Sequence, residues 1–231
     1  MSELAWGTLG SPVGQLSVAC SAAGLAQVCF GPPPARATRA ARPDPGSSWR
    51  KDRQNGRDQD EDRGYAGQER RPAAARARAG EASAQPEGTD GGPAAAQRQL
   101  GRACTQLGEY FAGQRRAFDL PVDWSGMSAA QRQVLAVLLA SAAYGETVTY
   151  GGLARRAGVA DGSRLPAARV TGQIMGSNPC PIIVPCHRVV AGDGLGGYSG
   201  GAGIEIKRWL LIFEGALPPT LDWDASGPGV S

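Results

Sequence analysis

Short apolar runs separated by turn residues occupy the beginning of the chain. Between residues 4 and 30 these runs are interrupted at Gly10-Ser11-Pro12 and at Ser21-Ala22-Ala23-Gly24. Apolar runs bounded by glycine, proline and serine are typical of strands joined by hairpins. The pattern therefore predicts a small unit of hairpin-connected strands.

A helical pattern begins only after a long gap. Apolar side chains then recur three or four positions apart, and Gly113 supplies a stop. These positions are Leu100, Cys104, Leu107 and Phe111. We expect this helix to complete one small α/β domain with the strands, formed by residues 1–30 and 98–122.

The remainder, residues 123–215, predicts a mostly helical second domain. Ser128 and Gln131 form a possible capping box at the start of its first helix. Two short helices follow, over residues 149–157 and from Pro166 to about residue 175, and such a pair is typical of a helix-turn-helix. A last amphipathic helix is expected over residues 204–214, followed by a flexible tail over residues 216–231.

The gap between the two helical patterns has an unusual composition. Residues 31–99 contain no Val, Ile, Leu, Met, Phe or Cys, and carry 13 Lys and Arg against 10 Asp and Glu. Such a segment cannot bury enough apolar surface to offset the entropy lost on ordering. We therefore expect residues 31–97 to form a disordered, low-complexity insertion, acting as a spacer.

Charge and cysteine content limit the class of protein. Residues 31–99 carry the whole surplus of the +3 net charge, but a second basic group lies between residues 147 and 192, where the only acid is Asp161. This basic patch could bind phosphates, and it consists of Arg155, Arg156, Arg164, Arg169 and Arg188. Five cysteines without a Cys-x-x-Cys pair favour a reducing compartment. We expect a soluble cytoplasmic protein, or a nuclear one in a eukaryote, with no membrane span.

The candidate chemistry centres on Cys186, which directly precedes the only histidine of the chain, His187. A thiol reacts as its thiolate, and an imidazole can accept the thiol proton near neutral pH. A cysteine in an apolar stretch is more often a buried small hydrophobe. An apolar run over residues 182–184, which predicts a strand, leads to this thiol. Asn178 and a glycine-rich loop around Ser199 favour the reactive interpretation here, and Glu214 could orient the histidine.

Several segments together resemble the O6-alkylguanine-DNA alkyltransferases. The most specific is Pro185-Cys186-His187-Arg188-Val189, with Asn178-Pro179 upstream. Further matches are Tyr144-Gly145-Glu146-Thr147-Val148-Thr149-Tyr150, Gly197-Tyr198-Ser199-Gly200-Gly201, Trp209-Leu210-Leu211 and Glu214-Gly215. The resemblance implies an α/β (α+β) fold: an RNase H-like N-terminal domain and a C-terminal domain with a winged-helix-like helix-turn-helix. It covers everything except the insertion and the tail.

The function implied by this resemblance is DNA repair by a single irreversible transfer of an alkyl group from O6 of guanine to the protein's own cysteine. Cys186 would be the acceptor, His187 would deprotonate it through a water, and Glu214 would polarise His187. Asn178 would hold the turn before the active site, and Tyr150 would protonate the departing guanine.

The resemblance also implies the contacts to DNA. Arg169 would fill the gap left by the flipped base, and Ser199 with the backbone around Tyr198 would contact O6. The main-chain carbonyls of Cys186 and Val189 would accept the exocyclic amine. Further DNA contacts would come from Thr149, Gly172 and Gln173. The partner would be double-stranded DNA containing O6-alkylguanine, and we expect a monomer without cofactor or metal.

Two other functions are open to a chain with these residues. One is a lesion-binding protein of the alkyltransferase-like type, which recognises alkylguanine without repairing it; such proteins typically replace the cysteine that is retained here as Cys186. The other is a cysteine hydrolase, although the Cys and His of familiar thiol proteases come from distant segments rather than from adjacent positions.

Overall fold

The computed structural model describes residues 4–34, 92–162, 165–201, 203–220 and 227–228. Most of the predicted insertion and much of the predicted tail lie outside these residues. Within the described ranges, no helix has the length and apolar character that a membrane crossing needs.

The beginning of the chain forms a three-stranded antiparallel sheet in the order β1-β2-β3. Its strands are β1 (Ala5–Ser11), β2 (Gly14–Ser21) and β3 (Gly24–Phe30). Both turns fall at the glycine-rich positions that the pattern indicated. Gly24 has a φ of +141°, and a Cβ there would collide with the carbonyl oxygen of Pro121. The hairpin prediction is confirmed.

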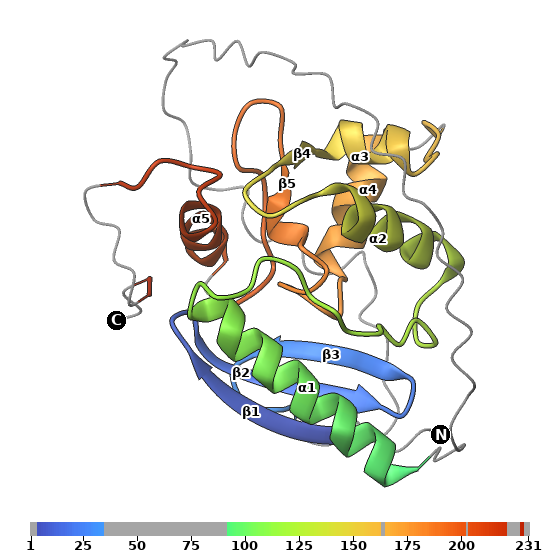
Figure 1. Ribbon diagram of the computed structural model, residues 1–231. Coiled ribbons are helices and arrows are strands. Elements are labelled where there is room, and N and C mark those ends of the chain that lie inside the picture. Colours follow the sequence, from blue (N-terminus) through green and yellow to red (C-terminus); the bar gives the residue numbers. More distant parts are fainter. Residues whose placement is uncertain (1–3, 35–91, 163–164, 202, 221–226, 229–231) are drawn as a thin grey trace, which may run out of the picture. The chain divides into compact units, whose positions relative to one another are not determined.

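Helix α1 (Pro93–Phe111) crosses one face of this sheet, as Figure 1 shows. It buries the apolar side that the spacing predicted, including Leu100 and Leu107. The predicted boundary at residue 98 is wrong, because residues 93–97 already belong to the helix. Pro93 at the first helical position has a φ suited to helix initiation, and the alanines that follow favour helix.

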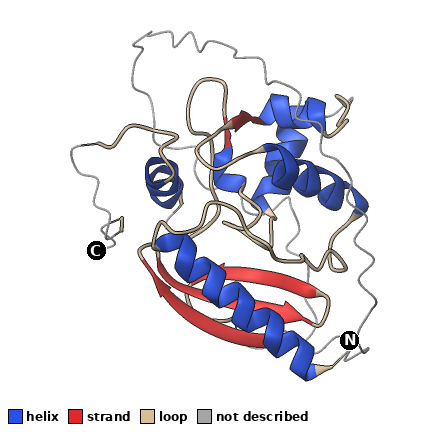
Figure 2. Cartoon of the chain, viewed as in Figure 1, coloured by secondary structure: helices blue, strands red, loops and turns tan. Residues whose placement is uncertain are grey.

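The rest of the described chain is mainly helical, as Figure 2 shows. The helices are α2 (Ala129–Ser141), α3 (Tyr150–Arg156), α4 (Ala167–Gly176) and α5 (Ile204–Phe213). Ser128 and Gln131 form the predicted capping box reciprocally. A short parallel pair, β4 (Val148–Thr149) and β5 (Val189–Val190), joins the start of α3 to the segment after Cys186.

One local prediction fails just before the candidate nucleophile. The apolar run over residues 182–184 looked strand-like, but it forms a compact turn in which Ile182 has a φ of 74°. The Val184 amide donates to the Cys180 carbonyl at 2.9 Å, and the Asn178 side-chain amide donates to the Val184 carbonyl at 2.8 Å. The run is apolar because its side chains are buried, not because its backbone is extended.

The strand unit contacts this turn directly. The Val28 amide of β3 donates to the Pro179 carbonyl at 2.8 Å, so β3 lies beside the segment that leads to Cys186. At another point, Tyr110 at the end of α1 reaches Glu214 at the end of α5. These contacts place residues of the N-terminal strand-and-helix unit next to the predicted chemistry.

Candidate active site

Cys186 begins a short 3-10 helix, η1 (Cys186–Arg188), directly after the compact turn. Its amide donates to the Val184 carbonyl at 2.8 Å, which fixes the backbone at the thiol. The side chain is 6% exposed and lines a pocket of about 250 Å³. A buried thiol that still borders a pocket can meet a small ligand group while bulk water is largely excluded.

The sequence neighbour of the thiol, His187, is fully buried and is held by Glu214. Its Nε2 lies 3.0 Å from Glu214 Oε1, and Glu214 follows the last residue of α5. The other ring nitrogen, Nδ1, is buried and has no hydrogen-bond partner among the described residues. A carboxylate on Nε2 selects the tautomer with the proton there, which leaves the Nδ1 lone pair to accept a proton.

Arg188 completes this group, and its place corrects an expectation from the sequence. Its Nε donates to Glu214 Oε2 at 2.8 Å and its Nη2 to Glu214 Oε1 at 2.9 Å, while Nη1 bonds the Ala142 carbonyl at 2.7 Å. The side chain is buried. Arg188 is therefore not part of a surface basic patch, because its guanidinium is buried in an ion pair with the Glu214 carboxylate.

The protonation states of the pair follow from burial and charge. Burial favours the neutral carboxyl, but the hydrogen bonds and charges of His187 and Arg188 outweigh it and lower the pKa of Glu214 to about 2. Burial lowers the pKa of His187 below its usual value, although Glu214 acts against this change. At neutral pH the imidazole is therefore uncharged, and Arg188 is the cation that keeps Glu214 ionised.

Burial also governs the thiol. It raises the pKa of Cys186, although the Asn178 amide and the Lys207 ammonium act in the opposite direction. The thiol is therefore protonated at neutral pH and needs a base to become a nucleophile. The neutral imidazole of His187, the next residue in the chain, can accept the thiol proton.

Lys207 is a fully buried cation on α5 that sequence reasoning missed. Its Nζ donates to the carbonyls of Val189 at 2.7 Å and Gly197 at 3.2 Å, and also to that of Leu195. Burial lowers its pKa to about 8, opposed by the charge of Cys186. A single ammonium thus joins the strand after Cys186 to the loop that carries Tyr198.

The pocket beside Cys186 has walls from both parts of the described chain. Its lining residues are Val28, Cys29, Phe30, Met175, Gly176, Asn178, Pro181, Cys186, Tyr198, Ser199, Gly200 and Gly201. The Phe30 ring meets the Tyr198 ring edge to face at 6.4 Å. The Tyr198 hydroxyl is buried close to the Cys186 thiol, and burial followed by the charge of Cys186 raises its pKa. Three predicted residues, Asn178, Tyr198 and Ser199, therefore share one pocket with the thiol.

Tyr150 contacts the loop that carries Tyr198. Its hydroxyl donates to the Gly197 carbonyl at 3.2 Å, and the Lys207 ammonium lies 5.7 Å from its ring centre. A Cβ at Gly172 of α4 would come within 3.8 Å of this ring, whereas a Cβ at Gly196 would approach it to 2.8 Å. Tyr150 is thus seated between α4 and the loop, and only glycine fits at residue 196.

The remaining predicted contact residues are not among those that line this pocket. Arg169 and Gln173 are exposed on α4, and Thr149 is the exposed N-cap of α3, where its hydroxyl accepts from the Gly152 amide at 3.0 Å. Val189 is buried, and its carbonyl bonds Lys207. The predicted site therefore divides into a buried group around Cys186 and an exposed row on α3 and α4.

Sequence reasoning also missed Tyr110, Arg188 as a buried ion-pair partner, and Phe30. Only Lys207 left a weak signal, because it interrupts the apolar side of the helix that contains Ile206 and Leu210. Among the described residues, no group of three or more His, Cys, Asp or Glu side chains is arranged to hold a metal ion.

Comparisons with known proteins agree with this geometry. A family model described as the DNA-binding domain of 6-O-methylguanine DNA methyltransferase matches residues 129–216. A methylated-DNA–protein-cysteine methyltransferase of Methanopyrus kandleri is 44% identical over 133 residues, which make up 57% of this chain and 92% of that protein. The chain belongs to the methylated-DNA–protein-cysteine methyltransferase family. The family expected from the motif around Cys186 is confirmed.

Other relatives share less of their length with the chain. The mouse methylated-DNA–protein-cysteine methyltransferase is 50% identical over 84 residues, which span only 37% of that protein and 36% of this chain. A DNA base-flipping protein of Thermus thermophilus is 43% identical over 110 residues, which are 47% of this chain and 68% of that protein.

A solved structure of a methyltransferase matches nearly the whole chain. The crystal structure of Mycobacterium tuberculosis OGT in complex with DNA superposes with a TM-score of 0.57 at 28% identity. The match covers 97% of this chain and 95% of that one. This agreement supports the expected mixed α/β fold, with a small N-terminal strand unit and a helical C-terminal part.

Proposed function

We propose that this chain repairs DNA by moving an alkyl group from O6 of guanine to Cys186, irreversibly and once per chain. The observation that carries the proposal is the arrangement around the thiol. Cys186 borders a pocket, and His187 beside it has one nitrogen bound to Glu214 and the other without a partner. Membership of the methyltransferase family supports the same conclusion.

The first step is removal of the thiol proton. His187 Nδ1 takes it through a bridging water, and Glu214 stabilises the imidazolium that forms, as a carboxylate does in other nucleophile and base pairs. Arg188 holds both carboxylate oxygens in place during this change. The buried thiolate is short-lived, because the same burial that raises the pKa of Cys186 disfavours its charge.

The second step is displacement at the saturated alkyl carbon. A sulfur lone pair forms the S–C bond while the C–O bond breaks, and its electron pair passes to the guanine ring. Tyr150 donates a proton to that ring and is reprotonated from the His187 imidazolium through solvent, so the net change moves one proton from Cys186 to guanine. Burial, and after it the charge of Cys186, raise the pKa of Tyr150, and the charge of Cys186 disappears as the thioether forms.

The DNA contacts follow from the exposed row on α3 and α4. These helices pack against each other, and we infer that they form the helix-turn-helix of a winged-helix-like unit, with α4 entering a groove. Exposed Arg169 occupies the space left when the damaged base is flipped out, a motion that costs a few kcal/mol. Exposed Thr149 and Gln173 and half-buried Gly172 contact the DNA backbone.

The flipped base enters the pocket beside Cys186. Backbone groups around Tyr198 and Ser199 contact O6, and the carbonyls of Cys186 and Val189 accept the exocyclic amine. A carbonyl has two lone pairs, so Val189 can accept this amine while it bonds Lys207. We also propose that the N-terminal unit has an RNase H-like topology. The protein would act as a monomer and without a cofactor.

A binding-only role is the alternative, and one relative of the chain is named a DNA base-flipping protein. Such a protein needs the helix pair and the pocket but no nucleophile. The retained Cys186 and the His187–Glu214 pair beside it favour transfer.

Intact-mass spectrometry after mixing the full chain with excess duplex carrying one O6-methylguanine tests the proposal. We expect one added methyl group per chain, with no further gain at longer times, and peptide mapping should place it on Cys186. Cys186→Ser is the matched control and should bind the duplex without gaining mass. Unchanged mass with tight binding of the damaged duplex would favour the binding-only role instead.

A further inference from the structure

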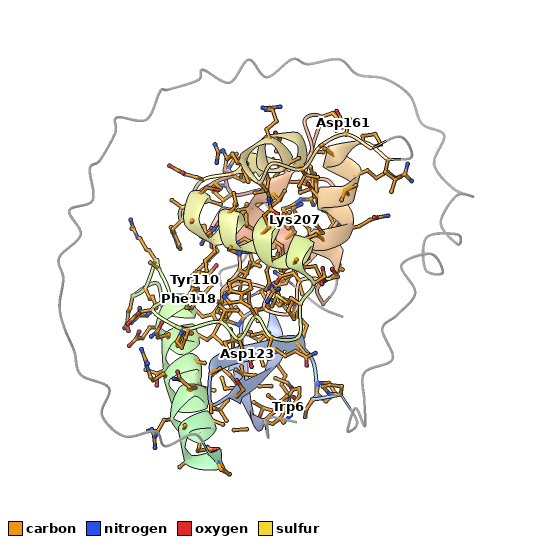
Figure 3. The ribbon with its side chains drawn as sticks, turned by 90° about the vertical axis from the view of Figure 1, so that its right-hand side faces the viewer. Trp6, Tyr110, Phe118, Asp123, Asp161 and Lys207 are labelled. Carbon is orange, nitrogen blue, oxygen red and sulfur yellow. The ribbon has the colours of Figure 1, made fainter. Side chains whose placement is uncertain are left out.

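Tyr110 joins the N-terminal unit to the catalytic carboxylate. It lies in the last turn of α1, is 0% exposed, and donates its hydroxyl to Glu214 Oε1 at 2.7 Å. Figure 3 places it at the end of α1 that faces the helical part of the chain. The two residues are 104 positions apart, so this bond forms only when the two parts are folded together.

We propose that Tyr110 is a positioning residue for the transfer reaction: its hydroxyl fixes the Glu214 oxygen that bonds His187 and limits how strongly the imidazole holds a proton. The inference rests on the proposed function, in which His187 is the base. It adds to that function a residue from outside the helical part that carries Cys186.

Three hydrogen-bond donors share one oxygen atom of Glu214. Glu214 Oε1 accepts from Tyr110, His187 Nε2 and Arg188 Nη2, at 2.7, 3.0 and 2.9 Å. Its Oε2 accepts, among the described residues, from Arg188 Nε alone. Donors that share an acceptor compete for its charge. The shortest of the three bonds comes from Tyr110, so the tyrosine weakens the hold of the carboxylate on the histidine proton.

The hydroxyl can be separated from the ring, because the ring has its own contacts. Four aromatic side chains pack on it, with ring centres between 5.1 and 6.2 Å away: Phe111, Phe118, Tyr144 and Phe213. Tyr110→Phe keeps this packing and removes one hydrogen bond. The carboxylate also keeps its place in this variant, since Arg188 still binds both oxygens. The electrostatic effect of the hydroxyl is then what remains to be measured.

Other charged and titratable groups surround the pair and must stay constant. Arg188 and Lys207 act on His187 as cations, and Tyr144 lies close enough to feel the charge of Glu214. Cys186 is the adjacent residue. None of these is altered in Tyr110→Phe, so a change in the histidine can be assigned to the lost hydroxyl.

The test uses the fact that His187 is the only histidine of the chain. In the tag-free, full-length protein, the ring Cε1–H signal in a carbon-proton correlation NMR spectrum reports its protonation without ambiguity. We expect the titration midpoint in Tyr110→Phe to move to higher pH by about half a unit, the size expected for one neutral donor removed from a buried carboxylate. This readout does not depend on alkyl transfer.

Tyr144→Phe is the matched control. Its hydroxyl belongs to the same aromatic cluster but donates to the Phe213 carbonyl at 3.3 Å rather than to Glu214. The midpoint should not move in this variant. An unchanged midpoint in folded Tyr110→Phe, or an equal shift in both variants, would overturn the proposal.

A second substitution reverses the direction and guards against a folding defect. Replacing Tyr110 alone with 3-fluorotyrosine keeps the ring and makes the hydroxyl a stronger donor, so the midpoint should move to lower pH. In transfer assays on the acid side of the pH profile, the rate of Tyr110→Phe should be about threefold lower than that of the wild type. A threefold change in rate corresponds to the shift of half a pH unit. If neither the wild type nor the variants transfer a methyl group, the proposed function is wrong. The NMR titration still decides whether the Tyr110 hydroxyl acts on His187.

Discussion

Arg188 binds both oxygens of Glu214, at 2.8 and 2.9 Å, from a position next to the histidine that the same carboxylate holds. The arginine therefore does two things at once. It keeps Glu214 ionised in a buried site, and it fixes the carboxylate so that His187 retains one tautomer. Without this cation a buried carboxyl would tend to be protonated and could not orient the base.

The stability of the fold should fall as the pH drops below about 6.5. The pKa of His187 is lowered in the folded state from 6.5, so the unfolded chain binds more protons just below that pH and unfolding becomes easier. Urea denaturation between pH 7.5 and 5 should show the free energy of unfolding falling, by at most about 1.4 kcal/mol per pH unit for one proton. Glu214 has a pKa of about 2 in the folded state against 4.5 as its ordinary value, so it lowers the free energy of unfolding further only below pH 4.5.

His187→Gln is the control for this pH dependence. The chain has no other histidine, so the slope between pH 7 and 5 should flatten in this variant whatever its absolute stability. A slope that persists would assign the effect to another group.

Removing the Asn178 side chain should destabilise the fold and slow transfer. Its amide holds the Val184 carbonyl at 2.8 Å, and its Oδ1 accepts from the Cys180 amide at 3.0 Å. In Asn178→Ala the Val184 carbonyl keeps only its bond from the Cys186 amide, and the amide of buried Cys180 loses its partner. The unpaired amide should cost about 1–3 kcal/mol, measured by urea denaturation. The neighbouring Ser177→Ala removes hydrogen bonds of an exposed hydroxyl to Gln131 and to the Ile174 carbonyl, groups that water can then reach, so it should cost less, about 0.5 kcal/mol. Equal effects of the two substitutions would contradict this role.

An alanine side chain at residue 196 should displace Tyr150. Gly196 has a φ of +68°, and a Cβ there would lie 2.8 Å from the Tyr150 ring. Gly196→Ala should therefore lower the single-turnover transfer rate on duplex DNA by tenfold or more, on the order expected for a misplaced proton donor. Gly194→Ala is the matched control, since nothing lies within 4 Å of its Cβ position, and it should react at the wild-type rate.

Phe30 should limit the size of the alkyl group. It closes the pocket from the N-terminal unit, and its ring contacts Tyr198 and would touch a Cβ at Gly200. Phe30→Ala should raise the rate with O6-benzylguanine relative to O6-methylguanine by about tenfold, the effect of about 1.4 kcal/mol. Trp6→Ala, on the outer strand β1, should leave the ratio unchanged. An unchanged ratio in Phe30→Ala would show that this wall does not meet the alkyl group.

Local patterns predicted most of the elements correctly. The two hairpins, the capping box at Ser128 and the helices on either side of Gly158 depend on turn residues, caps and apolar spacing within a few positions. The start of α1 and the turn at Ile182 were predicted wrongly. The run around Ile182 is apolar because its side chains are buried. Pro181 and Pro185, together with the hydrogen bonds of Asn178, favour a turn there instead of a strand.

The sequence by itself determined the family and the reactive pair, because Cys186 and His187 are adjacent and their flanking motif is specific. It could not show that Arg188 is buried on Glu214, that Tyr110 bonds the same carboxylate, or that Phe30 walls the pocket. These contacts join residues tens of positions or more apart, and no periodicity records them. Only the packing of α5, α1 and β3 around the segment that holds Cys186 brings these residues together, and burial there sets the charge of each group.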